Sequence, residues 1–250
     1  MASIKNIFTP RTEEDGAFFY GIKRIISYRP KNIQLFEEAF THRSKNETNA
    51  DGNQKNYERM EFLGDALISS IIAAHLYKKV PSGNEGYLTK MRSKVVSREH
   101  LNELGKDLNL ILLVRTDIPT NQFGENLHGN IFEALVGAIY LDKGYSQVEK
   151  FIYKRVIKPY VDIQKLEGKI ISYKSLFIEW CQKNKMVFQF NVYEDTGNDA
   201  LKHFAVNLKL EEETVSKARA TSKKKAEEIA AKRAYYKLKK RIDSQMLLNS

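Results

Sequence analysis

The chain has 250 residues, enough for one large domain and a smaller one, and its 42% hydrophobic content is ordinary for a globular core. Its formal net charge of +10 points to a polyanionic partner, either nucleic acid or an anionic membrane surface. No apolar run reaches the roughly 18 residues of a membrane span, and the first residues lack the apolar region of a signal peptide, so we expect no membrane segment. Cys181 is the single cysteine, which excludes an intramolecular disulfide and fits a reduced, cytoplasmic setting.

Residues 1–165 show the apolar spacing of helices almost throughout, and strand-like alternation is scarce. The predicted helices span 18–27, 34–41, 57–77, 85–96, 97–104, 126–142 and 145–157. Gly105 and Gly144 lie where helices are expected to stop. The polar stretch 46–55 is predicted to be a loop. This part of the chain is therefore predicted to be all helical.

The predicted helix 57–77 carries a stripe of carboxylates, because Glu58, Glu61 and Asp65 are spaced at i, i+3 and i+7. We expect the opposite, buried side to contain Met60, Leu63, Leu67 and Ile71. Like charges stacked on a helix destabilise it by roughly a few tenths of a kcal/mol per pair, so the stripe favours a counter-charge such as a divalent metal ion. Acidic stripes are also common on solvated helix faces, and this helix alone leaves both interpretations open.

The predicted helix 126–142 favours the metal. Its apolar side is expected to contain Phe132, Leu135, Val136 and Ile139. Asn130 and Glu133 share the other side with Ala134 and Gly137, two small residues that would let another helix approach closely. We therefore expect the two helices to face each other and to bring together Glu58, Glu61, Asp65, Asn130 and Glu133. Oxygen ligands select a hard cation, Mg²⁺ or Mn²⁺, rather than zinc.

Three further residues of this part have two interpretations each. Phe62 is predicted to lie beside the acidic stripe, where it covers another element of its own chain or fits a pocket of a partner. His42 could be a general base, but a histidine near a helix end more often makes a structural hydrogen bond, and we favour that role. Glu85 opens a helix, where the helix dipole prefers an acid, so we place it at most in the outer part of a site.

The second part of the chain has a different pattern. A linker is predicted at 166–169, which divides the chain into 1–165 and 166–250. The second part is predicted to contain a helix at 172–181, strands at 187–193, 203–210 and 213–219, and a helix at 223–240. Lys223, Lys224 and Lys225 lie at the start of the last helix, where free backbone N–H groups already favour phosphate. The alternative is that these lysines form a solvated charge run.

Three motifs in order resemble the ribonuclease III family: LFEEAFTHRS at 35–44, YERMEFLGDAL at 57–67 and NIFEALVGAIYLD at 130–142. The α-β-β-β-α order of the second part, with lysines opening its second helix, resembles a double-stranded RNA-binding domain. Together the resemblances cover nearly the whole chain. They imply an all-α endonuclease domain at 1–165, followed by a small α+β double-stranded RNA-binding domain at 166–250.

The family resemblance also implies roles for single residues. Metal binding is implied for Glu61, Asp65, Asn130 and Glu133, and a catalytic role for Asp65, Glu133 and Glu58. Bound Mg²⁺, for which Mn²⁺ can substitute, would activate a water molecule, and two ions about 3.5 to 4 Å apart are usual for such hydrolysis. The products would have 5'-phosphate and 3'-hydroxyl ends. No nucleotide cofactor is expected.

The expected partners are double-stranded RNA and a second copy of the chain. Two paired active sites would each cut one strand and leave short 3' overhangs, and Phe62 would insert into the partner of the homodimer. The RNA-binding positions implied by the resemblance are Lys174, Ser175, Glu179, His203, Lys223, Lys224 and Lys225, with His203 expected in a loop at 196–203. The implied cellular role is the processing of ribosomal RNA precursors and the turnover of messenger RNA.

Two positions depart from the family pattern. Asn130 stands where the family usually has Asp, which removes one negative charge and predicts weaker metal affinity without loss of activity. Ile178 stands where a polar residue is expected, which removes one minor-groove contact. The alternative function is a non-catalytic double-stranded RNA-binding or ribosome-associated protein, although Glu61, Asp65 and Glu133 are retained. A basic DNA-binding protein is disfavoured because no helix-turn-helix or basic zipper pattern is present.

Overall fold

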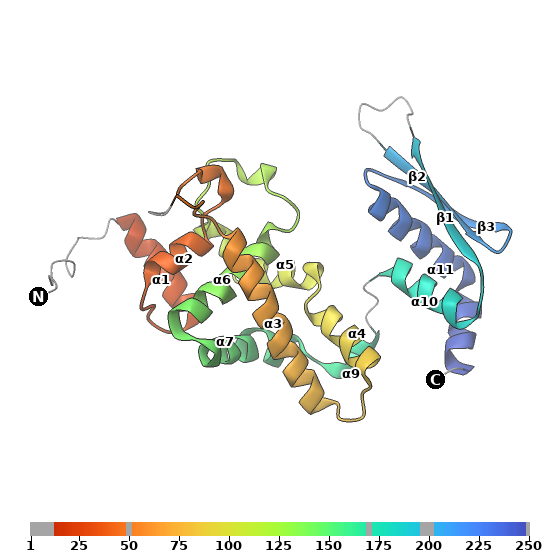
Figure 1. Cartoon of the computed structure of the whole chain (residues 1–250), viewed down its shortest axis with the longest axis horizontal. Coiled ribbons are helices and arrows are strands. Elements are labelled where there is room, and N and C mark those ends of the chain that lie inside the picture. Colours follow the sequence, from red (N-terminus) through yellow and green to blue (C-terminus); the bar gives the residue numbers. More distant parts are fainter. Residues whose placement is uncertain (1–12, 49–51, 169–171, 196–202, 249–250) are drawn as a thin grey trace, which may run out of the picture. The chain divides into compact units, whose positions relative to one another are not determined.

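The computed structural model describes residues 13–48, 52–168, 172–195 and 203–248. The chain forms two compact units, Met1–Lys169 and Ile170–Ser250 (Figure 1). In the described residues, the first unit is built from helices and the second from helices and a three-stranded sheet. The predicted fold class, an all-α domain followed by an α+β domain, is therefore confirmed. No described helix combines the length and the apolar character needed to cross a membrane.

The first unit consists of helices joined by short connections. The longer helices are α1 (Glu13–Ile26), α2 (Ile33–Ala39), α3 (Glu58–Lys79), α4 (Glu85–Val95), α5 (Arg98–Asp107), α6 (Leu127–Lys143), α7 (Tyr145–Ile152) and α9 (Ile163–Gly168). The shorter segments are η1 (Arg43–Lys45), η2 (Leu110–Leu113), η3 (Thr120–Gln122), the π-helical η4 (Tyr153–Ile157) and α8 (Lys158–Tyr160). Helix α5 continues to Asp107, so the stop predicted at Gly105 is wrong.

Helix α6 forms the centre of the first unit. It packs against α2, α3, α5 and α7, and these neighbours surround it in Figure 1. From Ile131 to Ile139 every residue is buried except Glu133, which is half-buried. A helix that is apolar on nearly all sides belongs in a core, and any polar residue on it therefore lies beside packed elements.

Helices α3 and α6 cross with their backbones in close contact. A Cβ atom added to Gly64 of α3 would lie 1.8 Å from the carbonyl oxygen of Glu133. In return, a Cβ atom added to Gly137 of α6 would lie 2.4 Å from the carbonyl oxygen of Met60. The close approach predicted from Gly137 is confirmed, and only glycine fits at these two positions.

This crossing corrects the predicted faces of α3. Its buried residues are Met60, Gly64, Ile68, Ile71, Ile72 and Leu76. Leu63 and Leu67 are only half-buried. The face of α3 that packs on α6 therefore lies closer to the carboxylates than predicted, because Gly64 is the residue at which α3 meets α6. The acidic stripe borders the α3–α6 contact and does not lie opposite it.

Helix α9 occupies most of the segment predicted to be a linker. Leu166 is buried, and the ammonium group of Lys94 donates to the carbonyl oxygens of Leu166 at 2.6 Å and Glu167 at 3.0 Å. Lys94 thereby satisfies carbonyl groups at the end of α9, which have no partners within the helix. The linker prediction is wrong over 166–168, because these residues belong to the packed first unit.

The second unit has one antiparallel sheet. Its elements are α10 (Tyr173–Lys183), β1 (Phe188–Asp195), β2 (His203–Leu210), β3 (Glu213–Ala220) and α11 (Lys223–Leu248). The strand order is β1-β2-β3, with Phe190 opposite Leu208 and Val206 opposite Ala218. Both helices contribute to the core beneath the sheet, which contains Phe177, Trp180, Val206, Leu208, Ala226, Ala230 and Ala234.

Glu228 of α11 caps the start of α10. Its carboxylate accepts hydrogen bonds from Ser172 Oγ at 2.8 Å, from the backbone N–H of Tyr173 at 2.6 Å and from that of Lys174 at 3.3 Å. Ser172 itself accepts from the backbone N–H of Ser175 at 3.1 Å. These bonds satisfy N–H groups that a helix start leaves without partners. The last helix of the second unit thus fixes the first one.

Candidate active site and RNA-binding face

A cavity of about 800 Å³ opens beside the α3–α6 crossing. Its walls include every residue predicted to form the acidic site: Glu58, Glu61, Asp65, Asn130 and Glu133. The stripe on α3 and the polar side of α6 therefore meet at one cavity. They do so because the carboxylates border the packed face of α3, where α6 approaches.

Glu133 is the most strongly perturbed carboxyl group of this cavity. Burial raises its pKa to about 8, with further contributions from the negative charges of Asp65 and Glu61, while the positive charge of Arg98 acts in the opposite direction. Burial and the charge of Glu58 likewise raise the pKa of Glu61. The cavity thus concentrates negative charge in a place with reduced access to water, and a cation would relieve that cost.

The start of α3 connects the acidic stripe to Asn130. Tyr57 is buried and precedes Glu58, whose backbone N–H donates to Asn56 Oδ1 at 3.0 Å. Burial raises the pKa of Tyr57, and a hydrogen bond with the Asn130 side chain acts in the opposite direction. Tyr57 and Asn130 are therefore neighbours on the cavity wall, one at the start of α3 and the other on α6.

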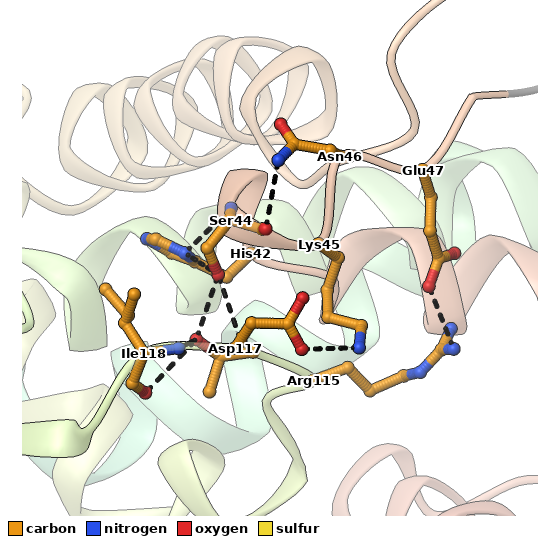
Figure 2. A network of polar contacts seen from close by, with 9 residues as sticks. His42, Ser44, Lys45, Asn46, Glu47, Arg115, Asp117 and Ile118 are labelled. Atoms are coloured by element: carbon orange, nitrogen blue, oxygen red, sulfur yellow. Dashed lines mark hydrogen bonds and ion pairs between the residues drawn. The ribbon is translucent and has the colours of Figure 1, made fainter.

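A polar network supports the part of the wall that contains His42 and Arg43 (Figure 2). The backbone N–H of Ser44 donates to His42 Nδ1 at 3.2 Å, and Ser44 Oγ lies 3.0 Å from the same nitrogen. Ser44 Oγ also lies 3.2 Å from Thr116 Oγ1 and accepts from the backbone N–H of Asp117 at 3.1 Å. The structural hydrogen bonds predicted for His42 are present. They tie residues 42–44 to the distant segment 116–117.

Ion pairs strengthen the same connection. Lys45 Nζ lies 2.6 Å from Asp117 Oδ1, and an Arg115 guanidinium nitrogen lies 3.1 Å from Glu47 Oε1, as Figure 2 shows. The backbone N–H of His42 donates to the carbonyl oxygen of Arg115 at 2.9 Å. Hydrogen bonds and ion pairs therefore both connect residues 42–47 to residues 115–117, and together they fix this part of the cavity wall.

The residues around the cavity fit a hard divalent cation in their chemistry. The four predicted carboxylates, a fifth from Glu125 and the Asn130 amide supply oxygen donors, and oxygen donors are what Mg²⁺ and Mn²⁺ prefer. In the described part of the chain, no three His, Cys, Asp or Glu side chains are grouped closely enough to form a metal cluster by themselves. The fit therefore rests on the donor type and on the accumulated negative charge.

Phe62 lies at the cavity with 81% of its surface exposed, the largest exposure among the described large hydrophobic side chains. Within the described residues it does not cover another element of the chain, which was one of the two interpretations of its position. A phenyl ring in water is unfavourable, and burying it against another molecule would gain about 2 kcal/mol. Its exposure therefore favours the remaining interpretation, a pocket of a partner.

In the second unit, Lys223, Lys224 and Lys225 are exposed at the start of α11. The Lys223 ammonium also lies 5.6 Å from the centre of the Phe204 ring. The backbone N–H of Lys225 donates to Ser222 Oγ at 3.3 Å, so Ser222 caps the helix. The lysines thus stand where the helix dipole and their own charges favour an anion.

The other predicted RNA-binding residues are in different surroundings. Lys174 forms an ion pair with Glu227 at 2.5 Å, and Glu179 forms one with Lys183 at 3.6 Å. Ser175 is exposed. His203 is the first residue of β2, paired with Asp195, which confirms the predicted strand 203–210. The loop predicted at 196–203 is wrong at this one residue. Residues 196–202 of that predicted loop lie outside the described residues.

Several residues of the cavity wall were not predicted, and Arg98 and Tyr57 are the two that interact with its carboxylates or with Asn130. Arg98 and Tyr57 line it together with the carboxylates. Arg98 is seen in the sequence only as the second residue of the predicted helix 97–104, and nothing in the spacing relates it to α3 or α6. Tyr57 was expected as the start of a helix, and its neighbour Glu58 was the only signal of its place.

Comparisons with known proteins identify the family to which each part of the chain is similar. The ribonuclease-III-like family matches residues 32–160, and the double-stranded RNA binding motif matches residues 173–238. The chain is 62% identical to ribonuclease 3 of Zunongwangia profunda over 243 residues, which cover 97% of this chain and 100% of that one. It is 59% identical to ribonuclease 3 of Flavobacterium psychrophilum over 246 residues, which cover 98% and 100%.

A solved structure shares the fold of the first unit. It is the nuclease domain of ribonuclease III from Campylobacter jejuni, with a TM-score of 0.50 and 24% identity over 64% of this chain and 99% of that domain. The helical fold, the acidic cavity and the near full-length similarity to two proteins of the same name agree with the three sequence motifs. The chain belongs to the ribonuclease III family.

Proposed function

We propose that this endoribonuclease of the ribonuclease III family hydrolyses double-stranded RNA with Mg²⁺, for which Mn²⁺ can substitute. The observation that carries the proposal is the gathering of Glu58, Glu61, Asp65, Asn130 and Glu133 around one cavity. Family membership supports the reaction type, and the double-stranded RNA binding motif at 173–238 supports the substrate class.

Glu61, Asp65, Asn130 and Glu133 are the residues that would hold the metal. A magnesium ion bound there supplies positive charge that lowers the pKa of water and stabilises negative charge on phosphate oxygens. Asp65 and Glu133 can accept hydrogen bonds from an attacking water molecule and so orient it toward the phosphate. Glu58 adds negative charge beside Glu61. Water adds to phosphorus as the bond to the 3' oxygen breaks, which leaves 5'-phosphate and 3'-hydroxyl ends.

The second unit would hold the substrate. The exposed Lys223, Lys224 and Lys225 are suited to binding phosphates on both sides of an RNA groove. Four further residues of the second unit are proposed to contact RNA as well: Lys174, Ser175, Glu179 and His203. The family's domain of this type recognises the shape of duplex RNA with little readout of sequence. Ribosomal RNA precursors and structured messenger RNA in the cytoplasm are the proposed cellular substrates.

The active form is proposed to be a homodimer in which Phe62 inserts into the partner. The support is its 81% exposure next to the cavity. Two paired sites would each cut one strand and leave short 3' overhangs. Phe62→Ala is expected to shift the chain toward a monomer in size-exclusion chromatography with light scattering. An unchanged mass would contradict this assignment of Phe62.

The test of the proposed function is cleavage of an end-labelled RNA hairpin with Mg²⁺, with Mn²⁺ and with chelator. We expect staggered cuts that require metal and disappear in Glu133→Ala. Glu103→Ala, which removes an exposed carboxylate of α5 away from the cavity, is the control and should cut normally. Asn130→Asp should lower the metal concentration needed, because a carboxylate restores the missing charge. Tight duplex binding without cutting under any metal would favour the non-catalytic alternative.

A further inference from the structure

Arg98 lies on the wall of the acidic cavity, although it belongs to neither of the helices that carry the carboxylates. It is the first residue of α5, whose start is capped by Ser97, since Ser97 Oγ accepts from the backbone N–H of His100 at 3.3 Å. Helix α5 is fixed against α6, because a Cβ atom on Gly105 would lie 2.2 Å from the carbonyl oxygen of His128. The backbone of Arg98 is therefore held in place relative to Glu133.

The cavity contains two arginines with different surroundings. Arg43 lies 3.9 Å from Glu58, within the range of an ion pair. Arg98 is exposed, and its side chain makes no hydrogen bond or ion pair with any part of the chain that the structure describes. Its charge nevertheless acts on Glu61 and Glu133, whose pKa values it lowers against the effect of burial. Arg98 is thus close to the carboxylates without being bound to one of them.

An arginine in this position suits a phosphate. A guanidinium group offers five N–H donors in a planar fork that matches two oxygens of one phosphate, and it keeps its charge at any relevant pH. The carboxylates would hold any metal ion and, through it, would bind some of the oxygens of a phosphate in the cavity. A donor on another wall of the same cavity can reach oxygens that are not metal ligands. Positive charge placed there stabilises the negative charge that develops on phosphate oxygens during hydrolysis.

We propose that Arg98 binds non-bridging oxygens of the RNA phosphate at the point of cleavage and is a substrate-binding residue of this ribonuclease. The proposal rests on the proposed function, since it assumes that the cavity is where RNA is cut.

The test uses the full chain with Arg98→Gln and Arg98→Lys. Arg24→Gln is the matched control, because it removes an exposed arginine from α1 and changes the net charge equally without touching the cavity. Cleavage of an RNA hairpin is measured at saturating Mg²⁺ and across a Mg²⁺ titration. Binding of the same hairpin is measured in chelator at several salt concentrations, which gives a readout that does not require metal.

We expect kcat/KM to fall about 100-fold in Arg98→Gln, the usual loss when one donor to a developing charge is removed, and less in Arg98→Lys, which keeps the charge and loses the fork. The salt slope of binding should become shallower by about 1 in Arg98→Gln, as for the loss of one phosphate contact. Arg24→Gln should cleave like the wild type.

Three results would overturn the inference. If Arg98→Gln cleaves normally and needs less Mg²⁺, Arg98 is only a counter-ion of the carboxylates. If its losses follow a large drop in melting temperature, Arg98 has a structural role. If the salt slope does not change, no phosphate contact is lost. Failure of the proposed function looks different, because then the wild type and Arg24→Gln also fail to cut with Mg²⁺.

Discussion

The acidic cavity of the first unit and the basic helix start of the second unit place their functional residues in opposite ways. Glu133 lies on a core helix, and its own carbonyl oxygen packs against Gly64 of the neighbouring helix. Lys223, Lys224 and Lys225 lie on an exposed turn, while the core beneath them consists of other residues of α11. In the first unit, chemistry and packing therefore depend on the same backbone. In the second unit they are separate.

The largest effect is expected from Gly64→Val, which attacks the shared backbone directly. Its Cβ atom would lie 1.8 Å from the Glu133 carbonyl oxygen, so α3 and α6 must separate. We expect a loss of about 3 kcal/mol or more in the free energy of unfolding, and loss of cleavage, because the carboxylates move with the helices. Calorimetry and the hairpin assay measure the two effects.

Gly16→Ala is the matched control for this variant. An added Cβ atom at Gly16 of α1 meets nothing within 4 Å, and alanine is favoured over glycine in helices by about 1 kcal/mol. Gly16→Ala should therefore have unchanged or higher stability. If Gly64→Val is also stable and active, the α3–α6 crossing is not as tight as described.

The next largest effect is expected from Glu133→Gln, which separates charge from packing at the same position. The amide keeps the size of the side chain, so the helices should remain packed, while the loss of a proposed metal ligand should reduce kcat/KM by about 100-fold or more. In chelator the variant should be at least as stable as the wild type, because the cost of burying a charged group and the repulsion from Asp65 and Glu61 are gone. Paired measurement of kcat/KM and melting temperature checks this. A destabilised variant would mean that the carboxylate contributes to the fold.

A smaller effect is expected from replacing Lys223, Lys224 and Lys225 together by alanine. Affinity for duplex RNA should fall roughly tenfold at moderate salt, and the slope of log K against log salt should become shallower by about 3. The melting temperature of the chain should be unchanged, since all three side chains are exposed. Fluorescence anisotropy titrations in three salt concentrations measure the slope. An unaltered slope would indicate a solvated charge run that binds nothing.

The smallest effect is expected from Glu228→Gln. This variant tests whether residues that stabilise the second unit are separate from those that bind RNA. The amide can keep only part of the bonds to Ser172, Tyr173 and Lys174, so the second unit should lose about 1 kcal/mol. Thermal unfolding should show this loss, and RNA affinity at low temperature should stay within about twofold of the wild type. A large loss of affinity would join stability to function in this unit as well.

The sequence predicted the parts of the molecule that depend on local periodicity. The helices around Glu58, Glu61 and Asp65 and around Asn130 and Glu133 follow from apolar spacing, and their meeting at one cavity follows from Gly137. The strands of the second unit follow from alternation. Both kinds of spacing are regular patterns of neighbouring residues, so they can be recognised in a single sequence without an alignment.

The sequence did not predict features that arise only when distant segments meet. Gly64 has no side chain and does not count in an apolar pattern, so the packed face of α3 was assigned to Leu63 and Leu67. Arg98 reaches the cavity only because α5 is packed on α6. His203 was placed both at the end of a loop and at the start of a strand, because the pairing with Asp195 that decides between the two is not a local property.

The bond between Lys94 and the end of α9 has a practical consequence for anyone who wishes to produce the nuclease part by itself. A recombinant fragment that ends at residue 165 would lack the carbonyl oxygens of Leu166 and Glu167 and would leave a buried ammonium group with no acceptor. Such a group costs about 1 to 3 kcal/mol, and more when it carries a charge. Burial already lowers the pKa of Lys94, so its ammonium form depends on these acceptors in the intact chain. Fragments that stop after residue 168 keep the acceptors and should express as the more stable protein.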